Sequence, residues 1–298
     1  MTRPCRNIKM HNNGKIKILT ALIAVYISWG STYLAIRIAL QELPPLFMMG
    51  IRFFLVGVAL YIFLWLRGAP IPNGIQWRNA TIIGVFLFLG GSAGVAYAEQ
   101  WVPSGLAALV IATTPLWTVL FSGIWSEWPT RSEWAGLVLG LVGIVMLNFE
   151  GDLQASPIGA VALLIAAASW AFGSAWSRHL VLPKGQMTGA LQMIMGGAIV
   201  LLVSFITGEQ FVVIPTWRSL SAVIYLAVFG SLVGFTAYMH LLTRVRPALA
   251  TSYAYVNPVI AVTLGVWLAS EKISLIGIIA MLVIVAGVVL VAGIRQRV

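Results

Sequence analysis

Charged residues and cysteine are both scarce in this chain. Only 9% of its 298 residues are charged, against about 25% in an ordinary soluble domain. The single cysteine, Cys5, excludes an intramolecular disulfide. Hydrophobic residues make up 60% of the chain, the mean hydropathy is +0.97, and the apolar residues are spread over the whole length. This composition excludes a soluble enzyme with one membrane anchor and leaves no room for a separate soluble domain.

Carboxylates are lacking at the centres of the apolar segments, and the sequence shows no metal-ligating cluster. No Asp or Glu falls at the centre of any apolar segment, and no cluster of His, Cys and carboxylates has the spacing of a metal site. We therefore expect no metal and no cofactor. The net charge of +10 would suit a nucleic-acid binder only if it formed a basic face. Here the basic residues sit in short loops, so no nucleic-acid partner is expected.

Ten apolar segments, most of them near the length of about 20 residues that a bilayer requires, alternate with short loops. They fall at about 18–40, 46–66, 80–100, 104–125, 133–149, 157–179, 187–207, 219–241, 248–269 and 273–294. Apolar residues cover nearly all faces of these segments, as lipid requires of a helix. The sequence therefore predicts an all-α membrane protein with ten transmembrane helices and membrane lipid as a partner.

The loops on the two sides of such a bundle differ in charge. One set of alternate loops contains four of the 18 basic residues, which are Arg37, Arg52, Arg218 and Lys272. The other set contains the remaining 14 and only two of the eight carboxylates. The positive-inside rule therefore places both termini in the cytoplasm. Residues 1–17 form a basic cytoplasmic tail, and the long apolar run that follows is interpreted as a retained helix rather than a signal peptide.

The two halves of the sequence, 18–149 and 157–294, resemble each other in order. Trp29 and Trp170 are 141 positions apart. Further pairs, at offsets of 141, 143 or 144, are Arg37 and Arg178, Tyr97 and Tyr238, Pro115 and Pro258, Glu127 and Glu271, and Gly143 and Gly287. Because each half has five helices, an odd number, the second half is expected to insert upside down. Inverted repeats are typical of alternating-access transporters, with a small-molecule substrate near the midplane.

These motifs resemble those of the drug/metabolite transporter superfamily, and specifically its ten-helix exporters built from two EamA-type repeats, of the YedA-like kind. The motifs concerned are Trp29-Gly30-Ser31-Thr32-Tyr33, Ile51-Arg52-Phe53, the run from Ala250 to Val259, and Glu271-Lys272-Ile273-Ser274. The likeness covers nearly the whole chain from Ile18. It departs at Glu127-Trp128-Pro129-Thr130, where the family usually has a basic residue after the Glu.

The resemblance implies export of small metabolites across a bacterial inner membrane. The family's substrates include amino acids, aromatic compounds, dyes and organic cations, so drugs are possible cargo. The resemblance also implies a central cavity ringed by the first, third, fourth, sixth, eighth and ninth helices. The related four-helix multidrug exchangers carry a glutamate in the middle of their first helix, and the first helix here has none.

Two prolines and two tryptophans, one of each per half, fall near the middle of their spans. Each proline frees the carbonyl one turn back, which in a membrane must find a partner or line a wet cavity. Aromatic walls suit flat or cationic solutes, although core packing explains such residues equally well. The candidate substrate-binding residues are Trp29, Thr32, Tyr33, Tyr97, Thr114, Trp170, Ser174, Ser231, Tyr238, Ser252, Tyr255 and Asn257.

Ionisable residues at membrane depth are candidates for gating or ion coupling. The gating or coupling set is Arg37, Glu99, His240, Pro115 and Pro258. Arg37 and Glu99 could pair as a gate, and a histidine titrates near neutral pH, which keeps proton coupling open. Arg52 also lies at depth, and for both arginines snorkelling toward the interface is the alternative.

Two other functions stay open. Gly90-Gly91-Ser92-Ala93-Gly94 matches the serine-hydrolase motif G-x-S-x-G, but that motif needs a strand–turn–helix context, so an intramembrane enzyme is the remote alternative. Gly136 and Gly140 have the spacing of a helix-dimer motif. That spacing would suit a membrane assembly or sensor protein without transport, although packing within one chain explains it as well.

Overall fold

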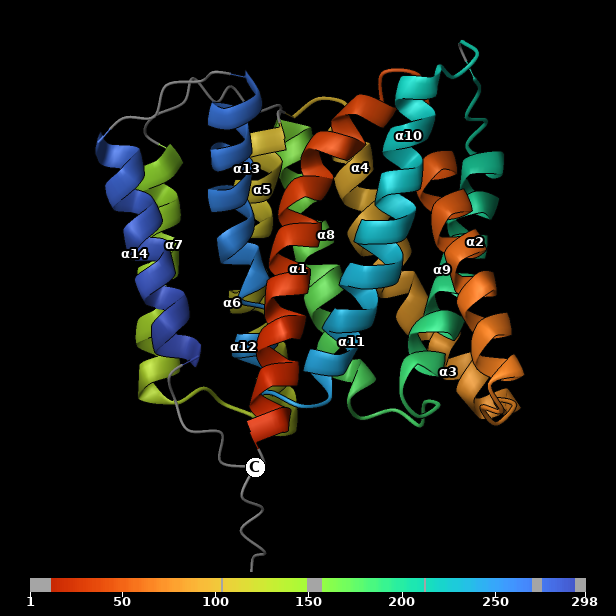
Figure 1. The fold of residues 1–298 in the computed structure, drawn as a ribbon, viewed down its shortest axis with the longest axis horizontal. Coiled ribbons are helices and arrows are strands. Elements are labelled where there is room, and N and C mark those ends of the chain that lie inside the picture. Colours follow the sequence, from red (N-terminus) through yellow and green to blue (C-terminus); the bar gives the residue numbers. More distant parts are fainter. Residues whose placement is uncertain (1–11, 103, 149–156, 212, 270–274, 293–298) are drawn as a thin grey trace, which may run out of the picture.

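The protein is a bundle of helices standing side by side (Figure 1). The computed structural model describes residues 12–102, 104–148, 157–211, 213–269 and 275–292, and every regular element in these residues is helical. Helices long and apolar enough to cross a membrane are Gly14–Ala39, Pro45–Leu66, Gly74–Ala98, Ile158–Ser177, Gln186–Ile206 and Trp217–Leu242. The all-helical membrane fold is thus confirmed. The other four predicted spans fall on shorter or interrupted helices, so ten crossings stay a prediction.

The first half of the chain forms nine helical elements. They are α1 (Asn12–Ala39), α2 (Pro45–Leu66), α3 (Gly74–Gly84), η1 (Val85–Ala93), α4 (Gly94–Ala98), α5 (Ser104–Ile111), α6 (Thr114–Ser122), η2 (Gly123–Trp125) and α7 (Arg131–Asn148). The elements α3, η1 and α4 form one continuous helix whose middle, η1, is wound as a π-helix. The helices α5 and α6 are separated by a break at residues 112–113.

The second half repeats this pattern. Its elements are α8 (Pro157–Ser177), α9 (Gln186–Ile206), α10 (Trp217–Tyr225), η3 (Leu226–Phe235), α11 (Thr236–Leu242), α12 (Pro247–Ala250), α13 (Tyr253–Ala269) and α14 (Leu275–Ala292). The elements α10, η3 and α11 again form one helix with a π-helical middle. The two π-helices begin 141 positions apart, which is the offset of the two tryptophans.

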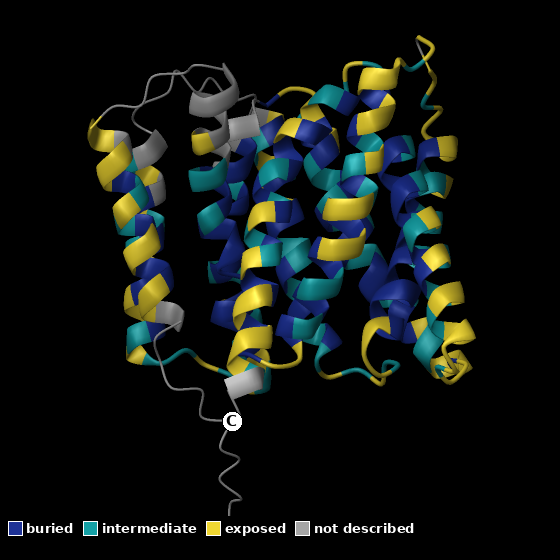
Figure 2. Ribbon diagram, in the orientation of Figure 1, coloured by how far each residue is buried: buried dark blue, intermediate teal, exposed yellow. Residues whose placement is uncertain are grey.

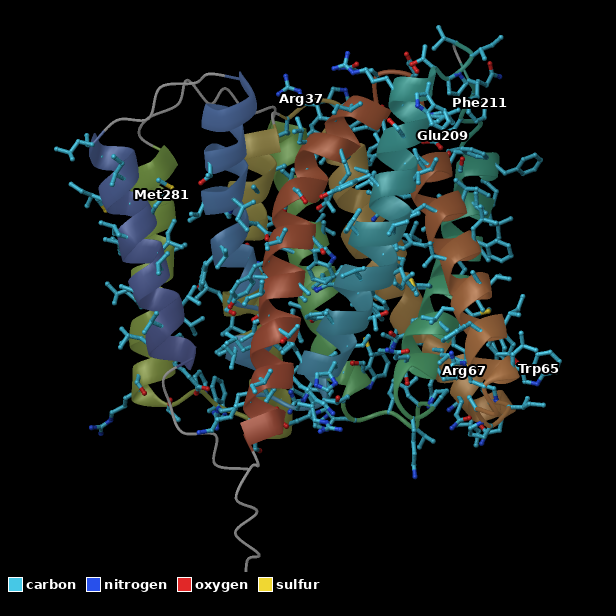
Figure 3. All side chains as sticks on the ribbon, viewed as in Figure 1. Arg37, Trp65, Arg67, Glu209, Phe211 and Met281 are labelled. Carbon is cyan, nitrogen blue, oxygen red and sulfur yellow. The ribbon has the colours of Figure 1, made fainter. Side chains whose placement is uncertain are left out.

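The two halves run in opposite directions. The helix α1 begins at the end of the molecule where α14 ends, whereas its repeat partner α8 begins at the opposite end (Figure 1). Helices of corresponding position pack together, since α2 contacts α9 and α7 contacts α14. Figure 3 marks the two ends of the bundle, which we name the Arg67 end and the Glu209 end.

Close helix contacts depend on glycine in the α7–α14 pair. A Cβ on Gly287 would lie 2.8 Å from both the carbonyl oxygen of Gly136 and the amide nitrogen of Gly140, which is too close for any side chain. The Gly136 and Gly140 motif therefore packs against α14 of the same chain. This contact is the within-chain explanation of the spacing, and it uses the surface that a helix dimer would need.

The surface and the interior divide as a membrane bundle requires. Figure 2 shows exposed residues on the outward faces of the helices and buried residues between them. Strongly exposed apolar side chains along the spans include Leu55, Leu66, Ile165, Phe205 and Leu282. In water such a surface would be an aggregation site, whereas lipid tails solvate it. The buried polar residues therefore gather inside the bundle, where the candidate site lies.

Candidate functional site

A cavity of about 100 Å³ lies inside the bundle between the two halves. The helices α1, α2, α4, α5 and α6 and the π-helix η1 line it from the first half, and α8, η3 and α13 line it from the second. The lining residues whose side chains carry a polar atom are Trp29, Thr32, Tyr33, Arg52, Ser92, Thr114, Trp170, Tyr253 and Asn257. Six of the twelve candidate binding residues predicted from the sequence therefore share one cavity.

The two tryptophans of the repeat meet in the wall of this cavity. The rings of Trp29 and Trp170 lie edge to face with centroids 5.4 Å apart. Tyr253 contacts Trp29 at 4.5 Å, and Tyr238 packs against both tryptophans at 5.1 Å and 5.6 Å. Edge-to-face pairs at these distances are favourable beyond their buried area. The result is a rigid aromatic cluster built from both halves.

The two π-helices receive side-chain hydrogen bonds in the same region. The indole nitrogen of Trp29 donates to the carbonyl of Gly230 in η3 at 2.9 Å. The hydroxyl of Ser169 donates to the carbonyl of Phe86 in η1 at 2.8 Å. The indole nitrogen of Trp170, in contrast, is buried and makes no hydrogen bond of good geometry among the described residues, although the hydroxyls of Tyr238 and Tyr253 lie close to it. π-Helical segments often mark functional sites, and here one tryptophan is bonded to such a segment while its repeat partner is not.

Proline interrupts both halves beside the cavity, with different consequences. Pro115 frees the carbonyl of Ile111, and the hydroxyl of Thr114 donates to that carbonyl at 2.5 Å. Pro258 lies inside α13, and the side-chain oxygen of the adjacent Asn257 is buried without a partner in the described part of the chain. At Pro115 the freed carbonyl is therefore satisfied by a side chain of the same helix. Beside Pro258, in contrast, the Asn257 side-chain oxygen is an unpartnered acceptor in the cavity wall.

Arg52 is a residue for which the sequence left open whether its side chain is buried at membrane depth or snorkels to the interface. The structure buries it in the cavity wall at 6% exposure. Its Nε and Nη1 atoms have no hydrogen-bond partner among the described residues. Its place near the start of an apolar segment is visible in the sequence, but only the packing of α2 shows that the side chain is buried in the cavity wall.

The other candidate binding residues lie outside this cavity. Tyr97 is 45% exposed, contacts Trp101 at 4.9 Å and lines a second cavity instead. Tyr255 donates to the carbonyl of Leu137 at 3.3 Å. The hydroxyls of Tyr238 and Ser174 are bonded at 2.7 Å, as are those of Tyr26 and Ser252, and Ser231 is buried with no partner among the described residues.

The second cavity, of about 670 Å³, opens at the Glu209 end. The Glu209 carboxylate accepts from the amides of Leu46 and Phe47 at 3.0 Å and 2.8 Å, and so caps the start of α2. The Glu42 carboxylate accepts from the amide of Thr216 at 2.7 Å. This hydrogen bond is the main reason why the pKa of Glu42 lies below its usual range. These contacts tie loops of the two halves together at this end.

The charged residues predicted to act in gating form no ion pair with one another among the described residues. Arg37 acts electrostatically on Glu99, but the ion pairs among the described residues do not include them. Both carboxylate oxygens of Glu99 are buried and have no partner in the described residues. His240 is half-buried near the end of α11, where Arg244 and Lys17 are the charged groups that act on it.

The Arg67 end carries the ion pairs that join the halves. Arg246 Nε contacts the Glu133 carboxylate at 2.5 Å, and Arg178 lies 3.6 Å from Glu127. Arg178 also donates to two carbonyls of the turn after α11, at 3.1 Å each. The helix α12 and the start of α7 lie at this end (Figure 1). Each pair joins a residue of the first half to one of the second.

Comparison with known proteins agrees with this architecture. The model of the EamA-like transporter family matches residues 15–149 and again residues 157–293. The chain is 47% identical over 277 residues to the "Uncharacterized inner membrane transporter YedA" of Escherichia coli K12, covering 93% of this chain and 90% of that protein. It is 23% identical to the "Probable amino-acid metabolite efflux pump" of Salmonella typhimurium, covering 92% and 95% of the two chains.

A solved crystal structure shares the fold. It has a TM-score of 0.76 and 24% sequence identity, and the match covers 96% of this chain and 99% of that one. The double match of the family model accounts for the two inverted halves, and the identity to an inner membrane transporter extends over nearly the whole length. The chain is a membrane protein of the EamA-like transporter family.

Proposed function

We propose that the protein exports small metabolites across a bacterial inner membrane by alternating access through the cavity between its halves. The six long spans are completed to ten by α5 with α6, α7, α12 with α13, and α14. With ten crossings, the basic loops place the Arg67 end and both termini in the cytoplasm. The Glu209 end then faces the opposite side.

The observation that supports the proposal is that both halves of the chain contribute to the wall of the cavity. Nine helical elements from both halves line one cavity, and the repeat-related Trp29 and Trp170 touch in it. If one half rocked against the other, the residues that line the cavity would move relative to one another and the access to the cavity would change, as in transporters built from inverted repeats. A scaffold protein has no need of such a cavity, with unpartnered polar atoms from both halves facing it.

The two ends suggest how access is closed. The ion pairs of Arg246 with Glu133 and of Arg178 with Glu127 hold the halves together at the Arg67 end. The contact of Glu42 with Thr216 joins them at the Glu209 end. Export requires that the first set of contacts opens to admit solute and that the second set opens to release it. The unpartnered Glu99 carboxylate and His240 are the groups available for proton coupling.

The test is flux in proteoliposomes containing the purified protein. Amino acids, aromatic metabolites and organic cations are offered, with and without an imposed pH gradient. Saturable flux of at least one class supports the proposal. Dependence of that flux on the pH gradient would assign coupling to Glu99 or His240, and independence would indicate a facilitator. Absence of flux for all classes, with protein shown to be folded, would contradict export of these metabolites.

A further inference from the structure

Arg52 is a buried cation without a counter-charge. It lies in the second turn of α2, lines the central cavity and is 6% exposed. Its guanidinium carbon sits 4.3 Å from the centroid of the adjacent Phe53 ring. Its Nε and Nη1 atoms are buried and have no partner in the described part of the chain. A snorkelling arginine would expose its head to water, whereas two of the three guanidinium nitrogens of Arg52 are buried.

The described surroundings of this guanidinium supply no negative charge. Among the described residues that line the cavity, Arg52 is the one charged side chain. The ion pairs among the described residues involve Arg178 and Arg246 at the Arg67 end. An isolated buried cation is strongly unfavourable unless it is paired and hydrogen-bonded. Such a group is retained at a transport site when the solute brings the missing charge.

We propose that Arg52 binds the carboxylate of the transported solute, so that the substrates are compact monocarboxylates with an apolar or aromatic body. The proposal rests on the proposed function and specifies its substrate class. A planar guanidinium matches a carboxylate with two parallel hydrogen bonds. One cation balances one negative charge, which favours a monocarboxylate over a phosphate dianion. The unpartnered Nε and Nη1 are available donors, and either of them forms such a fork together with Nη2.

The rest of the cavity agrees with this solute. Trp29, Trp170 and Phe88 provide apolar faces for its body. The buried indole N–H of Trp170, which lies beside the hydroxyls of Tyr238 and Tyr253, is a further donor, and the unpartnered side-chain oxygen of Asn257 is an acceptor for an α-ammonium group. Both amino acids and simple carboxylic acids therefore match the polar groups of this cavity. An organic cation without a carboxylate would meet a like charge and no carboxylate from the lining residues.

The experiment measures binding of four related probes to the purified full-length protein by calorimetry. The probes are L-phenylalanine, 3-phenylpropionate, its neutral amide 3-phenylpropionamide, and phenethylamine. The variants are Arg52→Gln and Arg52→Lys. The matched control is Arg67→Gln, because Arg67 ends the same helix, is exposed and also lies over a phenylalanine ring. Size-exclusion profiles establish that each variant is folded.

Wild type and Arg67→Gln should bind the two carboxylates, and should bind the amide and the amine at least about tenfold more weakly. Arg52→Gln should weaken carboxylate binding by about 10- to 100-fold, as expected for losing charge-assisted hydrogen bonds. Arg52→Lys should lie between the two because it keeps the charge without the planar fork. The comparison of probes on wild type keeps the test decisive even where a variant misfolds.

Three results would overturn the inference. They are equal carboxylate affinity in Arg52→Gln and wild type, tighter binding of phenethylamine than of either carboxylate, and no carboxylate binding by folded wild type. The proposed function has its own readout, because flux of phenethylamine that is lost in Trp170→Ala would keep the central cavity as the route. That result would reject Arg52 as the carboxylate anchor and leave the transport proposal standing.

Discussion

The ion pair of Arg246 with Glu133 is the shorter of the two described ion pairs that join the halves at the Arg67 end. The Glu133 side chain is 2% exposed and lies 2.5 Å from Arg246 Nε. Its other oxygen accepts from the amide of Thr130 at 2.7 Å. Arg246 also donates to the carbonyl of Trp128 at 3.0 Å. Changing Arg246 to Gln removes the charge and leaves a buried carboxylate with one partner.

The free-energy cost of breaking this ion pair depends on how far its two side chains are buried. Removing one partner of a fully buried pair costs about 3–5 kcal/mol, whereas exposed pairs contribute about 0–1 kcal/mol. Glu133 is buried and the Arg246 side chain is 39% exposed, so an intermediate cost of about 2 kcal/mol is expected. If the pair is broken when the Arg67 end opens, this cost increases the open population about 30-fold.

The assay is alkylation of a cysteine placed at Ser177, which is buried at the end of α8. Cys5 is first replaced by Ser, so that the new thiol is the only one, and a membrane-impermeant maleimide is applied to inside-out vesicles. Arg246→Gln should raise the labelling rate about 10- to 30-fold. The control is Arg131→Gln, which removes an exposed arginine at the start of α7.

A double-mutant cycle separates the pair from its surroundings. Glu133→Gln alone should also raise the labelling rate, and the double variant should be less open than the sum of the single effects predicts. A rate in Arg246→Gln within twofold of the Arg131→Gln control would refute the conclusion that this ion pair keeps the Arg67 end closed.

Two further predictions concern the cavity wall and the Glu209 end. Gly234→Ala would place a Cβ 2.5 Å from the indole nitrogen of Trp29, so it should cost about 1–3 kcal/mol and lower the melting temperature, whereas Gly74→Ala, whose Cβ meets nothing within 4 Å, should not. Because the hydrogen bond from Thr216 lowers the pKa of Glu42, this contact should be complete above about pH 4.3 and be lost as the pH falls through the lowered pKa. Hydrogen exchange at the Thr216 amide should show that acid loss of protection, and Glu42→Gln should remove it.

The helical membrane fold and its two halves could be predicted from the sequence because both depend on one-dimensional features. The apolar composition indicates that the protein lies in a membrane, and the repeat offsets of 141 to 144 residues indicate two related halves. The two π-helices also begin 141 residues apart, although no residue pattern in the sequence predicts that these segments are π-helical. Their winding depends on contacts such as the Ser169 bond to Phe86, which join distant parts of the chain.

The site was less predictable because spans that are apolar on all faces do not reveal which face points inward. Tyr97 and Tyr255 share helices with cavity residues, yet they point toward the second cavity and toward α7. The same uncertainty applied to Arg52, for which depth in the span allowed either snorkelling or burial. Only the packing of α2 against its neighbours places its head in the cavity.

The most direct test of a transport site between the halves is the flux of one solute through two tryptophan variants. Trp170→Ala removes a wall of the cavity, and Trp217→Ala removes a 74% exposed tryptophan at the start of α10. Both variants are reconstituted in proteoliposomes at equal density with the solute that wild type carries best. Trp170→Ala should lower the flux at least about tenfold, while Trp217→Ala should keep it. Equal flux through both variants would contradict a transport site between the halves.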